Sequence, residues 1–180
     1  MRDYTAFSWS RALVRVSPLC LFVAACSGSS SGGSSAAVLT QAPHCTGSGA
    51  QLTIEGTVAG STITDSRTTD INAGYENVGT PNFRTPLSDL AGLESNQLAL
   101  TLTWADSLLN GEAAATTSGK MTLPANHPQA GATFCVSKGD VGFVSGGAED
   151  GVFKFAVSEV KAGADCSGAT SPADLRGCFH

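Results

Sequence analysis

Charged residues are scarce in this chain of 180 residues. Asp, Glu, Lys and Arg together make up 14% of it, against about 25% in an average soluble protein. So few charges exclude a coiled coil, whose helices carry charged positions beside the apolar seam. The formal net charge is −5, and a negative surface has no electrostatic attraction for the phosphates of a nucleic acid. We therefore predict no nucleic-acid partner.

Long apolar runs and histidines are also few. No apolar run reaches the roughly 18 residues that a membrane-spanning helix needs. The chain has three histidines, His44, His127 and His180, and none has a nucleophile and an orienting acid beside it in the sequence. We therefore interpret all three as exposed loop residues and predict no catalytic residue.

The first 25 residues have the pattern of a signal peptide. Arg2, Arg11 and Arg15 form a basic region, and a mostly apolar stretch follows over residues 16–25. Ten residues are too few to span a bilayer, but they match the apolar core of a secretory signal peptide. We predict that residues 1–25 are removed from the mature protein.

The apolar stretch ends in Val23-Ala24-Ala25-Cys26, which resembles the lipobox of bacterial lipoproteins. In that family the signal peptide is cleaved just before the cysteine. The thiol then carries a diacylglyceryl group, and the new amino group usually receives a fatty acid such as palmitate. The resemblance implies that Cys26 is the lipid attachment site, since two or more acyl chains anchor a protein stably. Ordinary secretion with a free Cys26 thiol is the alternative.

The residue after Cys26 bears on where the protein would be anchored. Inner-membrane lipoproteins of enteric bacteria often carry Asp there, whereas this chain has Ser27. The resemblance therefore implies an outer-membrane location, on either the periplasmic or the surface face. Loss of residues 1–25 would leave a net charge of about −7, which anionic headgroups repel. The lipid on Cys26, and not surface charge, would then hold the protein at the membrane.

A flexible tether is predicted after the lipidated cysteine. Residues 27–35 read SGSSSGGSS, a composition with too little apolar surface to fold. We extend this tether through His44, so that it covers residues 26–44. Residues 45–180 are then one extracytoplasmic domain, long enough to bury a single core.

Period-two alternation of apolar and polar residues dominates this domain. It is clearest over residues 52–58, 98–104 and 151–160, as expected for strands with one buried face. Only residues 85–93 and 172–175 have a helical pattern, and both segments are short. We predict an all-β fold, either an antiparallel β-sandwich or a small barrel of short strands.

Two disulfides are expected to cross-link the domain. Of six cysteines, Cys20 would leave with the signal peptide and Cys26 would carry lipid. The remaining four are Cys45, Cys135, Cys166 and Cys178. An even number of cysteines in an oxidising compartment favours disulfides, and three pairings are possible. We favour Cys166–Cys178 with Cys45–Cys135. The chain has no C-x₂-C pair, which argues against a zinc site and a redox motif.

Two aromatic residues are candidates for ligand binding. Tyr75 and Phe83 lie in the weakly patterned segment 72–84, where exposed rings would suit stacking on a sugar. Loop carboxylates, among them Asp65, Asp70 and Asp165, match no calcium-binding loop. We predict neither a metal nor a cofactor.

Together these features favour a non-enzymatic interaction or scaffold module in the bacterial envelope. Its expected partners are the membrane, through the lipid on Cys26, and an envelope protein, bound through loops or a strand edge. A lipoprotein that binds a glycan or a small ligand through Tyr75 and Phe83 is the alternative. An envelope hydrolase is a third hypothesis, and it requires a histidine brought beside a nucleophile by the fold.

Overall fold

The computed structural model describes residues 37–43, 45, 49–68, 71, 73–85, 97–145 and 151–180. The predicted signal peptide, Cys26 and residues 27–36 of the predicted tether lie outside this part of the chain. His44, Asp70 and most of the predicted helical segment 85–93 are also outside it.

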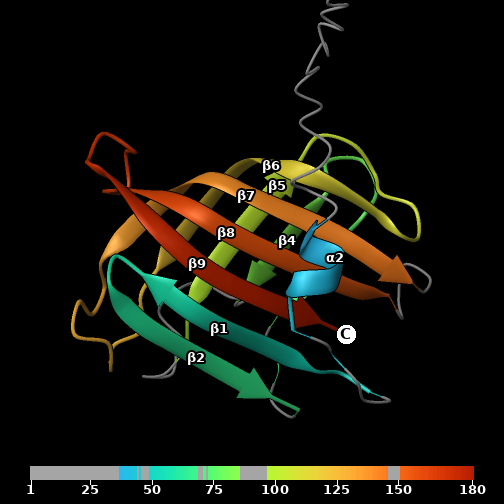
Figure 1. Cartoon of the computed structure of the whole chain (residues 1–180), viewed down its shortest axis with the longest axis horizontal. Coiled ribbons are helices and arrows are strands. Elements are labelled where there is room, and N and C mark those ends of the chain that lie inside the picture. The colour runs from blue at the N-terminus through green and yellow to red at the C-terminus, as the bar shows by residue number, and fades with distance from the viewer. Residues whose placement is uncertain are drawn as a thin grey trace, which may run out of the picture.

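One curled antiparallel sheet makes up the fold, in the order β2-β1-β9-β8-β7-β6-β5-β4-β3 (Figure 1). The strands are β1 (Leu52–Val58), β2 (Ser61–Arg67), β3 (Gly74–Glu76), β4 (Asn82–Thr85), β5 (Ala99–Trp104), β6 (Glu112–Thr122), β7 (Thr133–Ser145), β8 (Val152–Ala162) and β9 (Thr170–Phe179). The all-β prediction is confirmed, and the sheet is an open half-barrel. The helical prediction for residues 172–175 is wrong, because they belong to β9.

Alternation places the apolar side chains inside the curl. On β5, Leu100, Leu102 and Trp104 are at most 1% exposed, whereas Thr101 and Thr103 are only half-buried. Successive side chains of a strand point to opposite faces. The pattern seen in the sequence of β5 therefore becomes the inner and outer faces of the sheet.

Aromatic rings fill the interior of the half-barrel. The ring of Phe83 on β4 lies 5.2 Å from that of Phe153 and 5.1 Å from that of Phe155, both on β8. It also lies 5.9 Å from the ring of Phe179 on β9. These are favourable separations for aromatic pairs. Because β4 and β8 are not neighbours in the sheet, the rings meet across the curl and hold its two sides together.

The structure contains two disulfides, Cys45–Cys178 and Cys135–Cys166. Their number confirms the prediction, but the favoured pairing is wrong. Cys166 precedes β9 and Cys178 lies near its far end. The eight steps from residue 170 to residue 178 cover roughly 26 Å at about 3.3 Å each, which is too far for a bridge. Cys166 instead folds back over β7, where Cys135 lies beside Lys161 of β8.

A short helix, α2 (Ala37–Gln41), packs on the outer face of the sheet over β7 and β8 (Figure 1). Val38 and Ala42 are each only 3% exposed. Gly142 of β7 makes room for the helix, because a Cβ at this position would meet Leu39 Cδ2 at 2.5 Å. The prediction that the tether continues to residue 44 is therefore wrong, and the folded unit already includes residues 37–43.

A buried lysine holds this helix in place. Lys154 of β8 pairs with Gly142 across the sheet and is 1% exposed. Its Nζ donates to the carbonyl oxygens of Leu39, at 2.8 Å, and Ala42, at 3.3 Å. A cation suits the C-terminal carbonyls of a helical turn, which lack partners within the helix. Burial lowers the pKa of Lys154 below its usual range.

The substitution Gly142→Val should detach α2 without unfolding the sheet. Its side chain would occupy the space of Val38 and Leu39, and overpacking of this kind costs about 1–3 kcal/mol. We expect thermolysin to cut within residues 37–43 at least tenfold faster than in the wild type. Thr101→Val, on the outer face of β5, is the control and should leave the cleavage rate unchanged. An unchanged rate in the Gly142 variant would show that α2 is not held by this contact.

Candidate interaction surface

The two predicted ligand-binding rings belong to the core. Phe83 is 0% exposed. Tyr75 is half-buried, and its ring stacks on that of Phe153 at 5.6 Å. The prediction that they form an exposed platform is therefore wrong. They lie on β3 and β4, which have three and four residues and are too short to show a clear alternation in the sequence.

Two of the three predicted loop histidines, His127 and His180, lie in the part of the chain that the structure describes, and the ring of each contacts nearby backbone. His127 is 7% exposed, so the prediction that it is an exposed loop residue is wrong. Its Nδ1 accepts a hydrogen bond from the backbone N–H of Gln129 at 3.0 Å. The His180 ring contacts the carbonyl oxygen of Gly49, with Nδ1 at 3.0 Å. Both rings therefore hold local backbone in place.

Polar hollows lie on the outer face of the sheet. One of about 430 Å³ crosses β9, β1 and β2. Its lining consists of Glu55, Gly56, Thr57, Thr62, Thr64, Asp174 and Arg176. Arg176 Nε donates to Asp174 Oδ1 at 2.9 Å, and both side chains also line a hollow of about 210 Å³ beside α2. These groups can form hydrogen bonds with a polar molecule, but they include neither a thiol nor an imidazole.

Neither a metal cluster nor a membrane-crossing helix is found in the described residues. Their His, Cys, Asp and Glu side chains form no group of three that could hold a metal ion. None of their helices has the length and apolar character needed to cross a membrane.

One edge strand is protected against pairing with another chain. β2 ends the sheet, and its Asp65 points inward and is 4% exposed. Arg67 binds this carboxylate through two hydrogen bonds, Nε–Oδ1 at 2.7 Å and Nη2–Oδ2 at 2.6 Å. The prediction that Asp65 lies in a loop is therefore wrong, because the residue belongs to β2. Inward charges are a common way to discourage edge-to-edge pairing, so the β2 edge is a poor candidate for partner binding.

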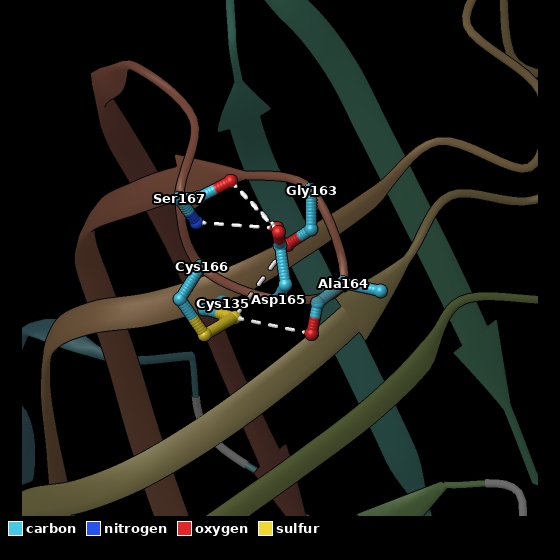
Figure 2. The surroundings of a disulfide bond; sticks show 6 residues. All are labelled: Cys135, Gly163, Ala164, Asp165, Cys166 and Ser167. Atoms are coloured by element: carbon cyan, nitrogen blue, oxygen red, sulfur yellow. Dashed lines mark hydrogen bonds between the residues drawn. A yellow bond between two sulfur atoms is a disulfide. The ribbon is translucent and has the colours of Figure 1, made fainter.

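Another loop carboxylate accepts hydrogen bonds beside the Cys135–Cys166 disulfide (Figure 2). Asp165 accepts hydrogen bonds from the Ser167 backbone N–H at 3.2 Å and from its hydroxyl at 2.9 Å. Hydrogen bonds to the charged form favour it. The bonds from Ser167 therefore hold the pKa of the Asp165 carboxyl below its usual range.

The β8–β9 loop should lose this arrangement only at strongly acidic pH. A carboxyl whose pKa is lowered in the folded state contributes stability above its ordinary pKa and loses it as the pH falls through the folded value. The NMR shift of the Ser167 amide should therefore titrate with a midpoint below the ordinary aspartate value of about 3.9. Asp165→Asn should remove this titration. A midpoint at or above 3.9 would contradict the assigned hydrogen bonds.

Two loops at one end of the sheet are joined by an asparagine side chain. The β3–β4 loop covers residues 77–81 and the β5–β6 loop covers residues 105–111; together we call them the loop tip. Asn77 Nδ2 donates to the carbonyl oxygen of Leu108 at 2.5 Å, and the Leu108 N–H donates to Asn77 Oδ1 at 2.9 Å. The Gly111 N–H also donates to the carbonyl oxygen of Phe143 at 2.7 Å. These bonds hold the β5–β6 loop against both β7 and the β3–β4 loop.

The loop tip exposes two large aliphatic side chains. Val78 is 66% exposed and Leu109 is 70% exposed, and they are the exposed large hydrophobic residues of the described chain. Neither loop contains Lys or Arg, whereas Glu76, Asp106 and Glu112 lie in or beside them. The tip thus carries two exposed aliphatic side chains, and the charged residues in or next to its loops are acidic. We did not predict it, because its two halves are 31 residues apart in the sequence.

No family model matches the chain, and neither a curated protein nor a solved structure matches it.

Proposed function

We propose that this chain is a lipid-anchored protein of the bacterial envelope whose folded domain binds another envelope protein without catalysing a reaction. The observation that carries the binding role is the loop tip, where Val78 and Leu109 are held in solvent by loops that are hydrogen-bonded to each other. The filled interior of the half-barrel also favours binding at the outer surface, because aromatic rings take up the space that a ligand would need.

The anchoring role is supported by the lipobox residues that end in Cys26. Two disulfides also favour an oxidising compartment outside the cytoplasm. Docking of α2 leaves about ten residues, 27–36, as the tether, with a typical reach of roughly 15–20 Å. The domain would therefore stay close to the membrane, attached through the outer face of β7 and β8.

Cell fractionation of the wild type and Cys26→Ala tests the anchor. We expect the wild type in the membrane fraction, with two or more acyl chains on a mature N-terminal peptide that begins at Cys26. The Cys26→Ala variant should lack these chains and leave the membrane. Cys20→Ala is the matched control, because this cysteine lies in the predicted signal peptide, and it should behave as the wild type. A wild-type protein with an unmodified Cys26 would overturn the proposal.

A further inference from the structure

Hydrogen bonds within the loop tip direct its two large aliphatic side chains into solvent. Leu108 is 7% exposed, and both of its backbone polar groups bond to the side chain of Asn77. Val78 follows Asn77 and Leu109 follows Leu108. The two hydrogen bonds between Asn77 and Leu108 therefore place the residues that follow them on the solvent side. The Leu109 N–H is itself fixed by Glu112 Oε2 at 2.8 Å.

Such an arrangement is suited to binding. Isolated exposed aliphatic residues are common on protein surfaces, but here two of them follow directly on residues that are bonded to each other. Burial of apolar surface contributes about 25 cal/mol per Å². Loops that are already ordered lose little conformational freedom when a partner binds. Val78 and Leu109 thus offer a small apolar contact that is already ordered before a partner binds.

The negative charge of the loop tip favours a protein over a lipid surface as its binding partner. Glu76, Asp106 and Glu112 lie in or next to the two loops, and neither loop contains a basic residue. Anionic headgroups repel an acidic surface, whereas segments that bind membranes are usually basic. A protein with an apolar pocket and a basic rim complements both features of the tip.

We infer that the loop tip docks into an apolar pocket with a basic rim on a folded protein of the same envelope. This inference rests on the proposed function, because the partner must share the compartment of the anchored chain. The aliphatic side chains of Val78 and Leu109 supply the buried contact. The acidic residues around them orient the two proteins and speed their association.

Site-specific photo-crosslinking in the native envelope tests this docking. A benzophenone amino acid is placed at position 78 or 109 of the full chain. The control position is Gln129, which is exposed in the β6–β7 connection at the opposite end of the sheet. We expect one discrete protein adduct from positions 78 and 109 and none from position 129. Adducts with lipid only, the same adduct from position 129, or no adduct from a correctly anchored chain would each overturn the inference.

Binding of the purified partner supplies the quantitative test. The protein identified in the adduct should bind the domain with an affinity that falls at least tenfold in Leu109→Ser and also falls in Asp106→Lys. Gln129→Ser should bind as the wild type. Because Leu109 is exposed, its substitution should leave the melting temperature unchanged, which separates loss of binding from loss of folding. Equal affinity of Leu109→Ser and the wild type would overturn the inference.

The two proposals fail in different ways. A chain that is not acylated at Cys26 fails the proposed anchor, whatever the crosslinks show. A chain that is acylated and membrane-bound, yet gives no specific adduct from the tip, fails the docking inference alone.

Discussion

Removal of the Cys45–Cys178 disulfide should lower the free energy of unfolding by about 4.5–5 kcal/mol. The bridge joins cysteines 133 residues apart, and the chain-entropy model gives about 4.7 kcal/mol for a loop of 100 residues. The Cys135–Cys166 bridge joins residues only 31 apart, and its removal should cost about 3.7 kcal/mol on the same model. Urea unfolding of Cys45→Ala/Cys178→Ala and Cys135→Ala/Cys166→Ala measures both values.

The order of the two effects tests the pairing. Each double variant removes one complete bridge and leaves no free thiol from it. Cys45→Ala/Cys135→Ala, in contrast, breaks both bridges and leaves Cys166 and Cys178 held apart by β9. This third variant should be the least stable, and the thiols of Cys166 and Cys178 should both be free. A new disulfide between Cys166 and Cys178 in the folded protein would contradict the structure.

The substitution Phe83→Ala should cost about 3–5 kcal/mol, the usual range when a buried phenylalanine is truncated. Its ring contacts rings on both β8 and β9, so its loss opens a cavity where the two sides of the curl meet. Phe83→Leu keeps most of the volume and should cost less than about 1.5 kcal/mol. Urea unfolding and near-ultraviolet circular dichroism would follow both changes.

Val78→Ala is the matched control for Phe83→Ala. It also truncates a large apolar residue next to one of the short strands, but at a position that is 66% exposed. Surface substitutions of this kind usually change stability by less than about 0.5 kcal/mol. A Phe83→Ala variant as stable as Val78→Ala would show that Phe83 is a surface ring and would revive its role in ligand binding.

The strands that could be predicted are those with enough residues to show their period. In β5 and β8, alternation continues over several residue pairs, and the buried set at Leu100, Leu102 and Phe155 follows directly from it. In β3 and β4 only three and four residues belong to a strand. The sequence therefore predicts exposed rings for Tyr75 and Phe83, although Phe83 belongs to the buried core and Tyr75 packs against it.

The docked helix shows a different limit of prediction. Residues 37–43 follow a Gly/Ser-rich tract and have no pattern that separates them from a tether. The features that bind them are the missing side chain of Gly142 and the ammonium group of Lys154. Both lie more than 100 residues further along the chain, so no local pattern could reveal the contact.

The sequence by itself determined two features: an all-β fold, from the alternation of apolar and polar residues, and two disulfides, from the even number of cysteines that remain after Cys20 and Cys26. The signal peptide and the lipid on Cys26 stay predictions. Only the tertiary structure decided which cysteines pair. The length of β9 separates Cys166 from Cys178, and β9 pairs with β1, the strand that follows Cys45. The loop tip likewise exists only in the tertiary structure. Asn77 and Leu108 meet only after β3, β4, β5 and β6 have paired in order, since the hydrogen bonds between the two loops depend on the register of four strands.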